Sequence, residues 1–267
     1  MEYEGLQGAS LGERANRLTA AAFDEVHAAT AKSTLLRELA ALAYGDEYPA
    51  EVAPTGMTTW WILGRCVAGL RVGPGERLVD LACGSGGPGL WLARASGADL
   101  VGVDWSPVAV EAARRRAADF LPEGRARFVV GELADSGLPS GQAAAVVCLD
   151  AVAFAPDRVA ALREVRRLLR PDGRYVVSAT EVASPPDRSS VTDWQPLLAA
   201  ADLQIESKDE VPHYAERLQR MYDLWLENLG PLEAEVGVET AAKLEQEARA
   251  VGPTLRQRRQ FLIVARP

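Results

Sequence analysis

The sequence predicts an α/β protein built on a doubly wound parallel sheet. From residue 77 to residue 208, short apolar runs alternate with helical stretches, which is the pattern of consecutive βαβ units. A glycine-rich loop, residues 83–89, joins the first apolar run to the first helical stretch. The chain has 267 residues, of which 48% are hydrophobic, so it holds enough apolar side chains to bury a core.

The residues before the sheet, 1–75, are expected to form an N-terminal helical cap. Ser10 and Ser33 are placed to cap two helices, since a serine side chain accepts a hydrogen bond from the first turn. The second of these helices is expected to stop at Gly45. A third helix is predicted over 58–70.

The sheet is predicted from seven apolar runs that have the lengths and residue types of strands. They are 77–82, 99–104, 126–131, 144–150, 174–179, 203–208 and 260–265. Helices are expected between the first six runs over 89–96, 106–119, 157–170 and 191–202. A longer helical stretch, 213–251, precedes the last run.

Composition and charge narrow the class of partner. The formal net charge of −8 argues against general binding to nucleic acid or to an anionic membrane. No apolar run reaches the roughly 18 residues of a membrane span, and the acidic first residues do not resemble a signal peptide. Cys66, Cys83 and Cys148 form no CxxC pair. These features predict a cytoplasmic protein without a metal site.

The glycine-rich loop and two carboxylates form the strongest functional signal. The pattern Gly84-x-Gly86-x-x-Gly89 opens a helix, whose free N–H groups suit a carboxylate or phosphate. Asp104 ends the second strand, where a carboxylate binds ribose hydroxyls, and Glu132 ends the third. In the alternative interpretation, the glycines only make a turn and the acids only cap helices. The combination favours a nucleoside-containing cofactor.

The glycine spacing fits two such cofactors. It satisfies the dinucleotide fingerprint of nicotinamide enzymes, but a pyrophosphate would be repelled by Asp80 just before the loop. A carboxylate there suits a ligand with a cationic amine, and S-adenosyl-L-methionine carries both an amine and a sulfonium. The sequence therefore favours S-adenosyl-L-methionine, with an NAD(P)-dependent oxidoreductase as the alternative.

Four segments resemble the class I S-adenosylmethionine-dependent methyltransferases. VDLACGSGGPGLWLA and GVDWSPVAVEAA are similar to the first two motifs of that family. GELADSGLP with AAAVVCLDAVAFAPD is similar to its adenine-binding and fourth-strand region, and LREVRRLLRPDGRYVVSA to its run into the fifth strand. The resemblance covers about 77–181 and is greatest to small-molecule enzymes of bacterial natural-product biosynthesis. Ala82 stands where a glycine is usual, and its small methyl is expected to be tolerated.

The resemblance implies a seven-stranded sheet whose last strand is inserted antiparallel. The chain then divides into four parts. They are an N-terminal helical cap (1–75), a cofactor-binding Rossmann-like core (76–205), a helical lid insert (206–259) and the final core strand (260–267).

The resemblance also assigns roles in cofactor binding. The implied binding residues are Asp80, Ala82, Gly84, Gly86, Asp104, Trp105, Glu132, Leu133, Leu149 and Tyr48. Asp80 and the glycine loop would hold the methionine end, and Asp104 the ribose. Trp105, Glu132 and Leu133 would surround the adenine. Leu149 would lie beside the transferable methyl group, and Tyr48 would close over the cofactor.

The acceptor is predicted to be an apolar or aromatic small molecule. The insert supplies an aromatic lining through Tyr214, Tyr222 and Trp225, and its acidic surface would disfavour phosphorylated acceptors. Related O-methyltransferases often place a histidine after the fourth strand, and this sequence has none there. His213 and Asp150 are therefore the candidate catalytic bases, with a surface-loop and a loop-anchoring role as their alternatives.

Several functional questions stay open at the level of sequence. Methylation at nitrogen, oxygen or carbon are all compatible with these motifs. The missing histidine also suggests a second alternative, a cofactor-binding protein that catalyses a step other than methyl transfer. The expected partner is a small-molecule acceptor, and the protein is expected to be a monomer or a homodimer.

Overall fold

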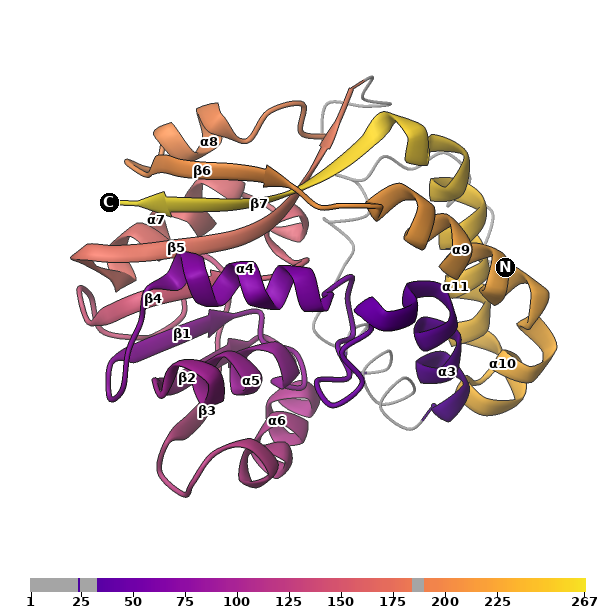
Figure 1. Cartoon of the computed structure of the whole chain (residues 1–267), viewed down its shortest axis with the longest axis horizontal. Helices are drawn as coiled ribbons and strands as arrows, with labels where there is room; N and C mark the ends of the chain where they lie inside the picture. The colour runs from indigo at the N-terminus through magenta and orange to yellow at the C-terminus, as the bar shows by residue number, and fades with distance from the viewer. Residues whose placement is uncertain (1–23, 25–32, 184–189) are drawn as a thin grey trace.

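A single seven-stranded sheet forms the centre of the computed structural model, which describes Asp24, residues 33–183 and residues 190–267. The strand order is β3-β2-β1-β4-β5-β7-β6 (Figure 1). The strands are β1 (Arg77–Leu81), β2 (Asp99–Asp104), β3 (Ala126–Val130), β4 (Ala143–Cys148), β5 (Leu169–Val182), β6 (Gln204–Glu210) and β7 (Arg258–Arg266). The first five pair in parallel, whereas β7 runs antiparallel to both β5 and β6. The predicted fold class and the antiparallel last strand are confirmed.

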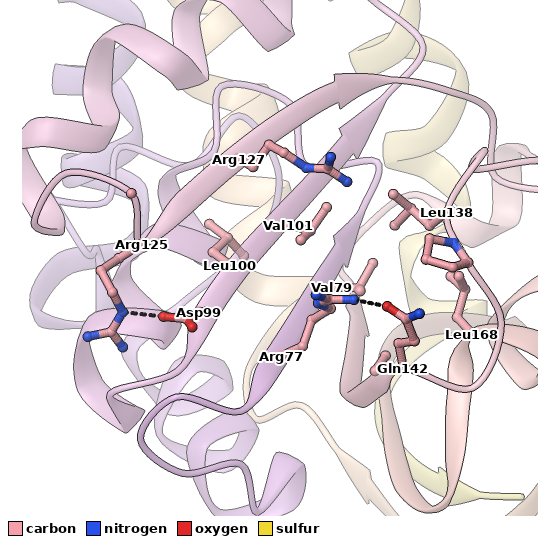
Figure 2. A pocket seen from close by; sticks show the side chains of 13 residues that line it. Arg77, Val79, Asp99, Leu100, Val101, Arg125, Arg127, Leu138, Gln142 and Leu168 are labelled. Carbon is pink, nitrogen blue, oxygen red and sulfur yellow. Dashed lines mark hydrogen bonds and ion pairs between the residues drawn. The ribbon is translucent and has the colours of Figure 1, made fainter.

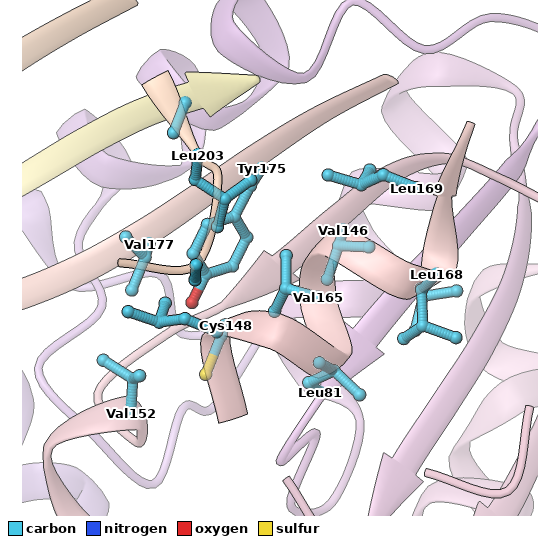
Figure 3. Close-up of a cluster of buried hydrophobic side chains, with 14 of the residues drawn as sticks. Leu81, Val146, Cys148, Val152, Val165, Leu168, Leu169, Tyr175, Val177 and Leu203 are labelled. Atoms are coloured by element: carbon cyan, nitrogen blue, oxygen red, sulfur yellow. The ribbon is translucent and has the colours of Figure 1, made fainter. Parts of the chain in front are cut away.

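Helices cover both faces of this sheet. They are α4 (Trp60–Leu70), α5 (Gly87–Ser96), α6 (Pro107–Phe120), α7 (Arg158–Leu168) and α8 (Gln195–Ala199). Leu63 of α4 and Leu90 of α5 share a buried cluster with Leu78 on one sheet face. On the opposite face, α7 and α8 pack on a second cluster around Val146 and the fully buried Tyr175 (Figure 3). Burial on both faces explains why the central strands read as nearly continuous apolar runs.

The link between β3 and β4 differs from the other crossovers. Residues 131–142 contain an isolated bridge between Glu132 and Asp135, but no helix. α7 packs on β4 and β5, and α8 packs on β6. In the part of the chain that the structure describes, one face of β2 and β3 is therefore left without a helix across it.

A separate helical layer lies beyond the carboxyl ends of the parallel strands (Figure 1). It consists of α3 (Thr34–Tyr44), α9 (Tyr214–Glu227), α10 (Leu229–Val236) and α11 (Val238–Val251). Leu39 of α3 packs with Leu224 and Leu232 in one buried cluster. Ser33 caps α3 as predicted, and its hydroxyl donates to Glu235 of α10 at 2.5 Å. These contacts join the N-terminal helix to the insert. Short 3₁₀ helices span Gly45–Glu47, Val152–Phe154 and Gly252–Gln257.

The structure draws the predicted domain boundaries differently. The cap predicted over 1–75 ends before α4, because α4 packs against α5 and the sheet. The insert predicted to begin at residue 206 begins after β6, since residues as far as Glu210 pair with β7. β7 itself begins at Arg258. The helix predicted from Ser10 lies outside the described residues.

The helix predicted over 191–202 is also much shorter than expected. Only Gln195–Ala199 is helical, because hydrogen bonds tie the preceding residue to β5. The Trp194 indole donates to the Thr180 carbonyl oxygen at 3.1 Å, and the Trp194 backbone N–H donates to Glu181 at 2.9 Å. Trp194 itself is the N-cap of α8. The Val191 carbonyl oxygen accepts from the Val182 N–H of β5 at 2.9 Å, so it is not available to an earlier helical turn.

Across the described ranges, no helix combines the length and the apolar character needed to cross a bilayer. Nor do these ranges bring together three or more His, Cys, Asp or Glu side chains that could hold a metal ion.

Candidate cofactor and acceptor site

The loop after β1 has the backbone conformation of a ligand cradle. Ala82, Gly84 and Gly86 have φ angles of +58°, +52° and +80°, in the region that glycine adopts freely. At Ala82 this conformation costs about 1–2 kcal/mol, so the departure from glycine carries a backbone penalty that its small size did not suggest. α5 begins without a side-chain cap at Gly86. Pro88 brings no N–H to its first turn and the Gly89 N–H donates to Asp80, so the Gly87 N–H is the donor of this turn that is left for a ligand carboxylate.

Two buried carboxylates flank this loop. Asp80 and Asp104 are 4% and 5% exposed. Asp104 accepts hydrogen bonds from the N–H groups of Gly84 at 2.8 Å and Ser106 at 2.9 Å. Burial, and after it the nearby charge of Asp104, raise the pKa of Asp80 to about 8, although a hydrogen bond from the Gly89 N–H acts to lower it.

The negative charge of Asp80 and Asp104 discriminates between S-adenosylmethionine and a dinucleotide as the ligand. No cation is among the described groups that act on the pKa of Asp80. Two carboxylates buried side by side are costly unless a ligand brings positive charge. The amine and the sulfonium of S-adenosylmethionine do so, whereas the pyrophosphate of a dinucleotide would add negative charge. The residues present therefore fit S-adenosylmethionine.

A segment that we call the strap, residues 45–59, crosses the start of α5. A Cβ on Gly87 would lie 2.1 Å from the Val52 carbonyl oxygen, so this close approach requires glycine. Arg116 of α6 donates to the same carbonyl oxygen at 2.7 Å and to the Ser85 hydroxyl at 3.1 Å. One arginine thus links the strap to the glycine loop.

Asp150 fastens the other end of the strap to the sheet. Its Oδ2 accepts a hydrogen bond from the Met57 N–H at 2.6 Å. Its Oδ1 accepts from the Ser178 hydroxyl at 2.9 Å and from Gln260 Nε2 at 2.8 Å. Burial raises the pKa of Asp150, although these three hydrogen bonds act to lower it. The geometry supports the loop-anchoring alternative for Asp150 over a free catalytic base.

His213, the other candidate base, begins α9. Its backbone has a φ of +54° and its side chain is exposed. A general base works best within hydrogen-bond reach of an acceptor from which water is excluded, and exposure counts against His213 on this ground. Its catalytic role stays a prediction. His27, expected to be structural, lies outside the described residues.

Aromatic side chains gather between the strap and the helical layer. Tyr44 is buried, and its pKa is raised first by burial and then by the charges of Asp150 and Tyr214. The rings of Tyr222 and Trp225 lie 5.4 Å apart on α9, a usual spacing for aromatic pairs. Tyr222 packs within the helical layer, where its hydroxyl donates to Glu247 of α11 at 2.9 Å, and the aromatic lining of the acceptor site stays a prediction.

The remaining predicted cofactor residues follow the carboxyl ends of the strands. Trp105 and Leu149 directly follow β2 and β4 and are half-buried. Leu133 is half-buried beside the sheet, whereas Glu132 is exposed. Tyr48 lies in the strap with its ring half-buried. The structure thus brings all five to the same end of the molecule as the glycine loop, as consecutive crossovers require.

Comparison with known proteins relates the part of the chain around the glycine loop to a described family. Residues 78–173 match the family described as a methyltransferase domain. The match confirms, over these residues, the predicted resemblance to methyltransferases.

Two solved structures show how far the fold extends. A methyltransferase from Geobacter sulfurreducens in complex with S-adenosylhomocysteine superposes with a TM-score of 0.62 at 20% identity, over 87% of this chain and 97% of that one. The [4+2]-cyclase SpnF superposes with a TM-score of 0.72 at 16% identity, over 96% of both chains.

Two curated relatives are named as methyltransferases. The methyltransferase GfsG of Streptomyces halstedii is 31% identical over 109 residues, which are 41% of this chain and 39% of that protein. The 27-O-demethylrifamycin SV methyltransferase of Amycolatopsis mediterranei is 27% identical over 221 residues, 72% of this chain and 79% of that one. The chain therefore matches less than two thirds of the first relative and most of the second.

Proposed function

We propose that this protein transfers the methyl group of S-adenosylmethionine to an apolar or aromatic small molecule in specialised metabolism. The buried pair Asp80 and Asp104 beside the glycine loop is the observation that carries this proposal, because it calls for a cationic nucleoside ligand. The relative that acts on 27-O-demethylrifamycin SV supports a role in natural-product biosynthesis.

The residues of the chain have distinct tasks in this reaction. The bound cofactor supplies a methyl group on sulfonium, which a nucleophile of the acceptor takes by in-line displacement. Asp104 is placed to hold the ribose, and Asp80 with the start of α5 to hold the methionine end. The strap and the helical layer keep the acceptor aligned and exclude water. Alignment of this kind supplies about 7–11 kcal/mol of barrier reduction.

Two features favour an apolar acceptor. Tyr44 packs against the half-buried Tyr48 of the strap, and the half-buried Tyr214 of α9 shares a cluster with Met57 of the strap. Residues 211–251, the insert after β6, carry eight carboxylates against four lysines and arginines, a balance of −4, which disfavours phosphorylated acceptors. Small-molecule pockets commonly combine such an apolar lining with a few polar groups.

A second candidate function is a step other than methyl transfer on the same cofactor fold. The state of the two candidate bases favours it, since Asp150 is engaged by three donors and His213 is exposed. The fold is shared over 96% of this chain with a [4+2]-cyclase. Methylation of a carbon or an amine would also need no strong base, so both reactions agree with this arrangement.

A ligand titration followed by a turnover assay tests the proposal. We expect S-adenosylhomocysteine to raise the melting temperature of the protein, and NADH to leave it unchanged. With a panel of aromatic and apolar acceptors, we expect product and S-adenosylhomocysteine in equal amounts. Stabilisation by NADH alone would replace the proposal with the oxidoreductase alternative. Conversion of an acceptor without S-adenosylhomocysteine would favour the second candidate.

The variant His213→Ala separates the chemical options. If His213 is the general base, kcat falls about a hundred- to ten-thousandfold while the affinity for S-adenosylhomocysteine is unchanged. A near wild-type kcat would remove His213 from the mechanism. That outcome would point to methylation at carbon or at an amine, because those nucleophiles attack before they lose a proton.

A further inference from the structure

The end of the sheet that lies opposite the cofactor site contains a hollow of about 480 Å³. It lies at the amino ends of β1, β2 and β3, on the face that no described helix crosses (Figure 2). Strand register aligns Arg77 with Asp99, and in the next row on the same face it aligns Val79, Val101 and Arg127. The hollow thus follows from the register of the sheet, and its volume is in the range of small-molecule sites.

Two guanidinium groups at this hollow are not neutralised by a carboxylate. Arg125 forms an ion pair with Asp99. Arg77, in contrast, donates to the amide oxygen of Gln142, which is a neutral partner. Arg127 is exposed, and in the described ranges its side chain forms no hydrogen bond or ion pair. An excess of positive charge is unusual on a chain whose net charge is −8.

An apolar floor separates these two cations. Val79 and Val101 lie between Arg77 and Arg127 in Figure 2. Leu138, from the helix-free link, closes one side of the floor. A ligand that fits this surface needs an apolar body and an anionic group. An apolar ligand would leave the arginines unpaired, and an inorganic ion would leave the apolar side chains exposed to water.

We propose that this hollow binds a small amphipathic anion. Its carboxylate or phosphate is held by Arg77 and Arg127, whose planar guanidinium groups match such anions in fork geometry. Its apolar part extends from the two arginines over Val79 toward Leu138. The strands between this hollow and the glycine loop have five or six residues, which is a separation of about 15–20 Å. The ligand is therefore bound at a second site and does not compete with the cofactor.

Calorimetry on the full chain tests this second site, with hexyl phosphate as the probe and S-adenosylhomocysteine present throughout. We expect saturable binding of one hexyl phosphate per chain. Inorganic phosphate should bind at least about tenfold more weakly and hexanol not measurably, since each lacks one half of the recognition. A parallel titration with heptanoate shows whether a carboxylate serves as well as a phosphate, and saturable binding of either anion supports the proposal.

Variants locate the bound anion. Arg127→Gln and Arg77→Gln should each weaken hexyl phosphate binding at least about tenfold, the effect of losing a charge-assisted hydrogen bond. Arg115→Gln is the matched control, because Arg115 is exposed on α6, where it pairs with Glu111 four residues away. Its affinity should equal that of the wild type.

Three results would overturn this inference. They are unchanged hexyl phosphate affinity in Arg127→Gln, equal affinities for hexyl phosphate and inorganic phosphate, and loss of binding in Arg115→Gln to the same extent. Arg127 is exposed, so its variant is expected to fold, and an unaltered melting temperature confirms that. The affinity for S-adenosylhomocysteine should be the same in all these variants, which keeps this test independent of the proposed methyltransferase activity.

Discussion

At the scale of single residues, Asp80 makes cofactor binding depend on pH. Its pKa is about 8 in the protein without ligand, whereas a bound cation favours the carboxylate form. Binding below pH 8 therefore releases a proton, and the affinity for S-adenosylmethionine should rise about tenfold from pH 6 to pH 7. The amine of the cofactor stays mostly protonated in this range. Calorimetry at both values checks this, and Asp80→Asn should bind more weakly with a flat profile.

The same raised pKa acts on folding. Because the pKa of Asp80 is about 8 in the folded protein and near the ordinary 3.8 of an aspartate in the unfolded chain, the unfolded chain loses this proton first as the pH rises. Through this group, the free energy of unfolding of the ligand-free protein falls as the pH rises from about 4 to about 8. Urea titrations at pH 6 and pH 8 should show a smaller loss in Asp80→Asn. An equal loss in both proteins would contradict the assignment.

Asp104 is expected to control affinity for the cofactor directly. Truncation in Asp104→Ala removes charge-assisted hydrogen bonds, worth about 1.5–3 kcal/mol. The affinity for S-adenosylmethionine should therefore fall about ten- to a hundredfold. Asp104 also accepts hydrogen bonds from the Gly84 and Ser106 N–H groups, so Asp104→Asn, which keeps one oxygen, is the control for a collapsed loop. Unchanged affinity in a folded Asp104→Ala protein would refute the ribose assignment.

Sequence reasoning reached some of these residues and missed the work of others. Asp80 and Asp104 were predictable because a carboxylate at the end of a parallel strand faces the ligand crevice. The role of Asp150 was undecided, because its partners Met57 and Gln260 lie 93 and 110 residues away. Three hydrogen bonds from such distant elements have no local pattern in the sequence.

At the scale of elements, the strap is the part of the site that only the structure shows. Its contact with Gly87 is made by the carbonyl oxygen of Val52, a backbone atom that any residue type could supply. The strands, in contrast, were predicted to within a few residues at most ends, because apolar runs buried on both faces are visible in composition. α8 was predicted too long, since the hydrogen bonds that hold Trp194 to β5 are tertiary.

The strap leads to a prediction about Arg116. This side chain is the described link from α6 to both Val52 and Ser85, so Arg116→Met leaves a buried carbonyl oxygen short of a donor. We expect about tenfold weaker binding of S-adenosylhomocysteine, because the loop and strap no longer hold one geometry. The neighbouring variant Arg115→Met removes only an exposed pair with Glu111 and should bind normally. Equal affinities in the two variants would show that the strap does not support the cofactor site.

At the scale of the whole molecule, the fold separates a rigid part from a layer that faces it. The sheet and the helices on its two faces hold the glycine loop, and the layer of α3, α9, α10 and α11 lies beyond the strand ends (Figure 1). α3 is far from the other three in sequence and joins them through the cluster around Leu39 and Leu232. In the proposed function, access of the acceptor would depend on contacts within this layer, and affinity for the cofactor on contacts below it.

Glu235 provides the test of this separation. Its carboxylate accepts hydrogen bonds from the Ser33 hydroxyl and from the N–H groups of Thr34 and Leu35 at the start of α3. These bonds lower the pKa of Glu235, so their contribution to stability is present above the pKa of the unfolded chain and is lost as the pH falls. Glu235→Ala should release α3 from α10, and hydrogen exchange measured by mass spectrometry should accelerate in those two helices.

The same variant should leave the sheet as it is. We expect the affinity of Glu235→Ala for S-adenosylhomocysteine to match the wild type, while the KM for the acceptor rises several-fold because the layer that encloses it is looser. Glu239→Ala is the matched control, since Glu239 is an exposed carboxylate in the first turn of α11. Two results would contradict this separation of layer and sheet. They are unchanged hydrogen exchange in α3, and a fall in affinity for S-adenosylhomocysteine as large as the rise in KM for the acceptor.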